Sequence, residues 1–230
     1  MKKLLYLFLT LLIVACSGED SNNQDNNDQD NNDGDNTVIN CSGDNPVYLA
    51  DNGVTVKACD FAIVGDTGVV NGIGYTIVDK ETLRNMISNG DDVTRVCTTR
   101  IISMERLLIG NTSFNQNISS WDVSNVTNME DMFWSAEAFN QPIGLWDVSN
   151  VTNMEKMFYR AYTFNKLIAG WDVSSVTNML YMFSSASSYN QDLSSWSVGG
   201  VTNCDGFSAG ATSWMAPKPN FTNCNCNCTP

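Results

Sequence analysis

The ten residues WDVSNVTNME at 121 to 130 recur letter for letter at 146 to 155, which is 25 residues later. A third copy, WDVSSVTNML, begins at Trp171, and a fourth, WSVGGVTNCD, begins at Trp196. Apolar residues recur at the same positions of every copy, while the residues between them vary. This pattern indicates stacked structural repeats. The aligned columns are Trp121, Trp146, Trp171 and Trp196; Met104, Met129, Met154, Met179 and Cys204; Phe114, Phe139, Phe164, Tyr189 and Trp214; and Ile118, Ile143, Ile168 and Leu193.

A period of 25 residues has the size of one coil of a leucine-rich-repeat-type solenoid. We therefore expect an α/β repeat fold with one short strand and one helical turn in each coil. The strand is expected at VTNM, around Val126 and its equivalents. The helical turn is expected at Met129, Met132 and Phe133, which lie at i, i+3 and i+4. The repeated Trp and Phe residues are expected to fill the interior.

The segment before the repeats, residues 37 to 97, has a different pattern. Asn-Gly pairs at 52–53 and 71–72 stand between apolar runs, which predicts two hairpins. Asp79 can cap a short helix through Leu83 to Ile87 that stops at Asn89-Gly90. We interpret this segment as a small β-rich N-terminal cap, followed by a repeat solenoid at 98 to 215 and a Cys-rich tail at 216 to 230.

The chain begins MKKLLYLFLTLLIVAC, with two lysines and then an apolar run from Leu4 to Ala15. The run is too short for a transmembrane helix, which needs roughly 20 residues, so residues 1 to 15 are predicted to be a signal peptide. Its end, Ile13 to Cys16, resembles a bacterial lipobox, which predicts lipidation of Cys16. Residues 16 to 36 carry no apolar side chain to bury after Cys16 and are predicted to form a disordered Asp/Asn tether. Glu19 and Asp20 resemble the surface-export signal of Bacteroidetes lipoproteins, which implies a surface-exposed, lipid-anchored protein of the outer membrane.

The composition excludes several classes of function. The 230 residues include no histidine, which excludes Ser-His-Asp and Cys-His nucleophile systems and His-ligated metals. The formal net charge of −13 argues against nucleic acid as a partner, because counterion release needs a basic surface. Removal of Lys2 and Lys3 with the signal peptide would make the formal charge −15.

Asp122, Asp147 and Asp172 share one phase and would form a column of like charges in a stack. Two interpretations remain open. Each carboxylate caps its own turn through the N–H groups near Ser124, Ser149 and Ser174, or neighbouring carboxylates hold a cation, most plausibly calcium. No other cofactor is expected.

Four aromatic residues, Trp134, Tyr159, Tyr162 and Tyr181, are expected at phases that vary between repeats and are not needed by the repeated core. Exposed aromatics suit an extracellular protein or glycan partner, and the other interpretation is scattered surface residues. Glu130 and Glu155 become Leu180 in the next copy, which fits a solvated face better than a pair of glycosidase carboxylates. We therefore predict no enzymatic activity.

Seven cysteines remain when Cys16 is set aside, and an exported protein forms disulfides. Because the number is odd, one cysteine stays free or pairs outside the chain. Three fall in the N-terminal cap and four at the C-terminal end, which predicts that disulfides fix the two ends. The candidates are Cys41, Cys59, Cys97, Cys204, Cys224, Cys226 and Cys228.

The sequence FNQ at 139 to 141, followed by WDVSNVTNM and a Met-Phe pair, resembles the BspA-like leucine-rich-repeat surface proteins over about residues 98 to 215. The resemblance implies a surface protein that acts as a binding or adhesion module. With the lipobox-like end at Cys16, we expect a non-enzymatic module that is attached to the membrane through its lipid anchor only. The alternatives are a structural surface spacer without a specific ligand and, with less support, a carbohydrate-binding accessory protein.

Overall fold

The structure, a computed structural model, describes residue 41 and residues 43 to 224. The predicted signal peptide and tether, Cys226 and Cys228 lie outside the described residues. The described residues belong to one compact unit. Within them, every strand and the single α-helix precede residue 98. No described helix has both the length and the apolar character needed to cross a membrane.

Two antiparallel hairpins form where the Asn-Gly pairs stand. Strands β1 (Val47–Leu49) and β2 (Val56–Ala58) pair around a loop in which the Asn52 side chain accepts hydrogen bonds from two backbone N–H groups. Strands β3 (Thr67–Val70) and β4 (Ile73–Ile77) are joined by Asn71 and Gly72, whose φ angles of 50° and 79° are left-handed as a type I′ turn requires. Strand β4 also pairs in parallel with β5 (Val96–Cys97).

Helix α1 (Lys80–Asn89) connects β4 to β5. The Asp79 carboxylate caps it by accepting from the Thr82 N–H at 2.8 Å, and this bond lowers the pKa of Asp79. Gly90 ends the helix in a left-handed conformation with φ 77°. Leu83 and Ile87 are buried against the first coils, so α1 covers the N-terminal end of the apolar core.

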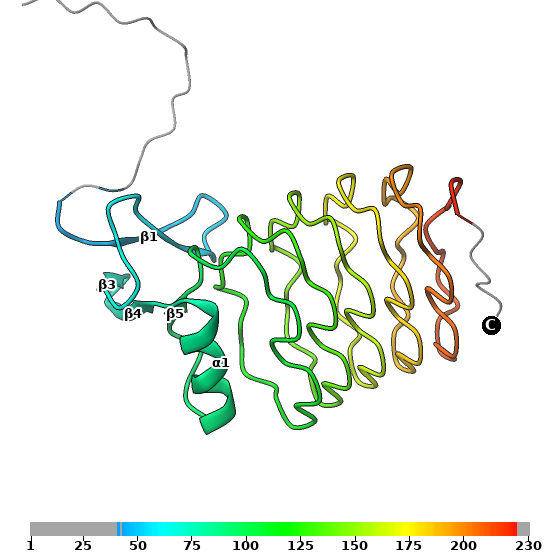
Figure 1. Cartoon of the computed structure of the whole chain (residues 1–230), viewed down its shortest axis with the longest axis horizontal. Coiled ribbons are helices and arrows are strands. Elements are labelled where there is room, and N and C mark those ends of the chain that lie inside the picture. Colours follow the sequence, from blue (N-terminus) through cyan, green and yellow to red (C-terminus); the bar gives the residue numbers. More distant parts are fainter. Residues whose placement is uncertain (1–40, 42, 225–230) are drawn as a thin grey trace, which may run out of the picture. The chain divides into compact units, whose positions relative to one another are not determined.

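From residue 98 to residue 224 the chain winds in successive coils that stack in register (Figure 1). Alternate N–H groups of one coil donate to the next. In the second coil, for example, Met129 N–H donates to Asn153 O and Phe133 N–H to Met157 O, both at 2.9 Å. Isolated parallel bridges mark the same register, and they link Ser103, Asn128, Asn153, Asn178 and Asn203 in order.

The predicted α/β leucine-rich-repeat solenoid, with a strand and a helical turn in each coil, is wrong. The described part of the repeats has no helix, and its parallel pairing is limited to single bridges. The segment MEDMFWS fails as a helix because Asp131 and Ser135 have φ angles of 55° and 54°. A left-handed residue ends a helix, and here it aims alternate N–H groups at the neighbouring coil instead of at residue i−4.

The aligned apolar columns form one continuous core along the coils. The four repeated tryptophans are at most 5% exposed, as expected for core residues. Each also donates its indole N–H to a backbone carbonyl. Trp121 donates to Val93 O, which precedes the coils, and the other three donate to the preceding coil; Trp146, for example, donates to Ile118 O at 3.2 Å. Phe133 stacks on Phe158 with ring centroids 5.3 Å apart. The apolar side chains and the indole N–H groups therefore both depend on a neighbouring coil.

Candidate functional site

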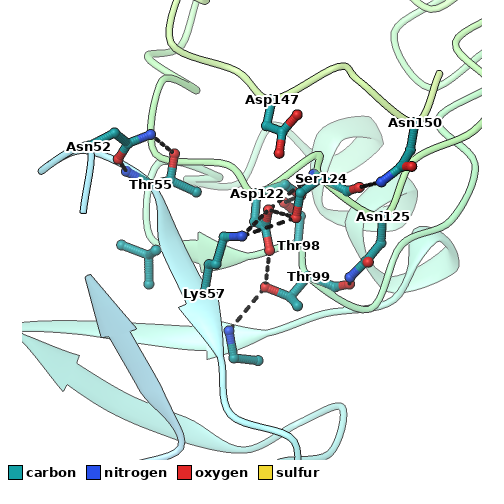
Figure 2. Close-up of polar contacts among 12 residues, drawn as sticks. Asn52, Thr55, Lys57, Thr98, Thr99, Asp122, Ser124, Asn125, Asp147 and Asn150 are labelled. Carbon is teal, nitrogen blue, oxygen red and sulfur yellow. Dashed lines mark hydrogen bonds and ion pairs between the residues drawn. The ribbon is translucent and has the colours of Figure 1, made fainter. Parts of the chain in front are cut away.

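Asp122 lies buried where strand β2 meets the first coils (Figure 2). Its Oδ2 accepts from the Thr99 hydroxyl at 2.6 Å, and its Oδ1 accepts from the Ser124 N–H at 3.1 Å and hydroxyl at 2.7 Å. The Lys57 ammonium lies 3.9 Å from Oδ1 and donates to Ser124 Oγ at 3.2 Å. The chain itself therefore supplies a positive charge next to the first carboxylate of the column.

Asp147 and Asp172 occupy the same phase in the next two coils and are exposed. Asp147 accepts from the Ser149 N–H at 3.1 Å and from its hydroxyl, and Asp172 accepts from the Ser174 N–H at 3.0 Å. The hydrogen bonds from Ser174 lower the pKa of Asp172. All three aspartates thus make the Asx-type turn that the sequence suggests. Among the described residues, no group of three or more Cys, Asp or Glu side chains is placed to hold a metal ion.

The aromatic candidates do not all behave alike. Trp134 and Tyr159 are 25 residues apart, so they share one phase and lie on neighbouring coils, contrary to the expectation of variable phases. Their rings meet edge to face with centroids 5.3 Å apart. Lys156 lies over the Trp134 ring at 5.7 Å and Arg160 over the Tyr159 ring at 5.2 Å. We call these four residues the aromatic–cation cluster.

Tyr162 and Tyr181 stand apart from this pairing and are exposed. Tyr181 has the phase of Lys156, and its ring lies directly against Gly206 of the following coil. Both tyrosines have a carbonyl or N–H that bonds a neighbouring coil, for example Tyr181 N–H to Asp205 O at 2.9 Å. Their side chains are therefore held on a fixed backbone.

The glutamates beside the cluster have structural partners. Glu130 accepts from the Asn153 amide at 3.0 Å, and Glu155 accepts from the Asn178 amide at 3.1 Å. Glu155 also bonds Lys156, and that bond raises the pKa of Lys156. Both carboxylates therefore join one coil to the next.

Disulfides form at both ends of the repeats, as predicted. Cys41 bonds Cys59 beside the hairpins, and Cys204 bonds Cys224, which joins the last repeat to the tail. Cys97 was also a disulfide candidate, but it is a buried free thiol near Val56 O. Burial raises the pKa of this thiol.

Two features of the site were missed in the sequence. The cations over the aromatic rings could have been found, because Lys156 and Arg160 lie at phases close to the one that Trp134 and Tyr159 share. Lys57 carries no such signal. It precedes the repeats, and the bonds that join β2 to the first coil, from Val56 N–H to Ser120 O at 2.9 Å and from Ala58 N–H to Thr99 Oγ1 at 3.0 Å, bring it to Asp122.

A search of curated proteins finds no match to this chain, and a search of solved structures finds none either. One family model matches twice, over residues 80–168 and 143–226, and is described as a Mycoplasma protein of unknown function, DUF285. The two segments together cover helix α1 and the coils, which is more than half of the chain. On this match the chain belongs to the DUF285 family of Mycoplasma proteins of unknown function.

Proposed function

We propose that this protein is a surface-anchored bacterial lipoprotein whose coils form a non-enzymatic binding or adhesion module. The lipobox-like end of the apolar run supports the anchor at Cys16 and a position on the outer membrane. The WDVSNVTNM motif supports a relationship to the BspA-like surface proteins, in the repeat sequence and not in the leucine-rich-repeat fold.

The observation that carries the binding role is the aromatic–cation cluster. It presents two half-buried rings and two cations on adjacent coils, and the backbone between them is fixed by bonds from coil to coil. Aromatic and arginine side chains on a rigid surface are the residues that most often dominate protein interfaces. Tyr162 and Tyr181 extend the aromatic character of the repeats.

The cluster favours a protein partner over a glycan. A sugar ring stacks on an open aromatic face, whereas each ring here already has a cation over it and the edge of one ring lies against the face of the other. An extracellular protein with acidic and apolar side chains would complement the cluster.

The proposal is tested by saturable binding of the mature chain to a panel of extracellular-matrix proteins and glycans. The test variant carries Trp134→Ala and Tyr159→Ala. We expect its Kd for the partner to be at least about tenfold higher than that of the parent chain. Leu145→Ala with Leu167→Ala is the matched control, since both are exposed apolar residues of the same coils. If the folded parent chain shows saturable binding to none of these molecules, the structural spacer is favoured.

A further inference from the structure

The loop between β2 and β3 presents three large apolar side chains to solvent. Phe61 is 57% exposed, Ile63 66% and Val64 41%, while Ala62 between them is buried. We call Phe61, Ile63 and Val64 the apolar loop. Single exposed apolar residues are normal, but three within four residues indicate a surface that contacts an apolar partner or a membrane.

The apolar loop is held in place by polar bonds and is not a frayed segment. The Arg100 guanidinium donates to the carbonyl oxygens of Cys59, Asp60 and Ala62, at 2.7, 3.0 and 2.8 Å. The Asp66 carboxylate accepts from the Ile63 N–H at 2.9 Å. A fixed loop loses little conformational freedom on binding, so its exposed side chains are arranged in advance for a partner.

The loop is also tied to the point where the chain enters the described fold. Cys59, two residues before Phe61, is bonded to Cys41. Between Cys16 and Cys41 stand 24 residues, which span at most about 85 Å when fully extended. An anchor at Cys16 would therefore keep the apolar loop within reach of the bilayer.

We propose that the apolar loop inserts into the outer leaflet of the bilayer that holds the lipid on Cys16. This inference rests on the proposed lipid anchor and adds a second membrane contact to it. The expected surface is zwitterionic, because the mature chain carries a formal charge of −15 and the nearby Arg100 is engaged by carbonyl groups. Apolar side chains buried in the bilayer would add their transfer free energy to the attachment that the lipid on Cys16 gives.

The test uses the mature chain from residue 16 onward, made without lipid through Cys16→Ser, and phosphatidylcholine vesicles in a flotation assay. We expect the parent to float with the vesicles and the triple variant Phe61→Ser, Ile63→Ser, Val64→Ser to partition about tenfold or more weakly. Ile63→Ser alone is expected to show a smaller loss. The matched control, Ile102→Ser, Leu145→Ser, Leu167→Ser, exchanges three similarly exposed residues of the repeats and is expected to float like the parent.

Equal flotation of the parent and the loop variant, including no flotation by either, would overturn the insertion. Loss of self-association in the loop variant without a change in flotation would overturn it too, and would assign the loop to a second copy of the chain. The anchor is checked separately by palmitate labelling of the wild-type precursor in a lipoprotein-producing host. Failure of labelling would refute the anchor, and flotation of the unlipidated chain does not depend on it.

Discussion

Replacing Tyr189 by Phe is expected to stabilise the protein. Tyr189 is fully buried in a column whose preceding members, Phe114, Phe139 and Phe164, are all phenylalanine. Its ring packs like theirs, 5.7 Å from Phe164 between centroids, but its hydroxyl has no hydrogen-bond partner among the described residues. The hydroxyl therefore lost its water on folding and gained nothing in return.

The magnitude follows from these contacts. A buried polar group without a partner costs about 1–3 kcal/mol, and removing one oxygen leaves a void that takes back a few tenths of a kcal/mol. We expect Tyr189→Phe to raise the free energy of unfolding by about 1–2 kcal/mol. The reverse change in the neighbouring coil, Phe164→Tyr, is expected to lower it by a similar amount.

The same burial makes the effect depend on pH. Desolvation raises the pKa of Tyr189 far above its ordinary value of 10.0. Below pH 10 the phenol is protonated in both states, and its ionisation contributes no pH dependence. Above pH 10 the unfolded chain loses this proton and the folded chain keeps it, so stability falls as pH rises. The advantage of Tyr189→Phe should therefore grow by about 1.4 kcal/mol at pH 11.

The measurement is urea unfolding of the parent and the two variants at pH 8 and at pH 11, with the disulfides intact. If the Tyr189→Phe variant is less stable than the parent at pH 8, the hydroxyl has a hydrogen-bond partner, which contradicts the prediction. An advantage that stays constant between the two pH values would show that the phenol ionises equally in the folded and unfolded chain.

Four further predictions concern the turns, the aspartate column and the tail. Gly206→Ala is expected to destabilise the last coil by about 1–3 kcal/mol, because φ is 60° and the new methyl group meets a tyrosine ring, and thermal unfolding would show a lower Tm. Lys57→Met is expected to cost about 1 kcal/mol in urea unfolding, since it leaves the buried Asp122 without its cation. Calcium at about 1 mM should leave the Tm of the parent unchanged, and a rise of several degrees would contradict the Asx-turn interpretation. Replacing Cys204 and Cys224 by Ser should cost about 3 kcal/mol, as expected for a crosslink between residues 20 apart, and an unchanged urea midpoint would show that the tail adds nothing.

The burial of the apolar residues in the repeats could be predicted from sequence, because equivalent residues of successive coils have the same surroundings. Trp121 and its equivalents stay tryptophan while the letters around them drift, which is the pattern of side chains packed at the same position in every coil. The hairpin at Asn71-Gly72 was predictable for a local reason, since both residues tolerate positive φ. The hairpin depends on adjacent residues and the buried columns depend on the repeat period. Both can be recognised in the amino-acid sequence.

The backbone between the columns was not predicted, because Met129, Met132 and Phe133 at i, i+3 and i+4 fit a helix and also fit consecutive turns. The buried side chains are the same in either case. Only the partners of the N–H groups differ, and in this fold alternate N–H groups donate to carbonyl groups of the next coil. Amphipathic spacing therefore could not separate the two structures.

A signal against the helix was nevertheless present in the alignment of the coils. The phase of Asp131 is occupied by Gly206 in the last coil, and the phase of Ser135 is occupied by Gly110 and Gly210. When glycine alternates with chemically different residues at one repeat position, the backbone at that position is expected to need a positive φ. All five of these residues have a positive φ angle. Two left-handed residues four positions apart exclude a continuous helix between them, because each breaks the i→i−4 ladder. The N–H groups then need acceptors from outside their own coil, so a coil that buries its side chains must also stack to satisfy its backbone.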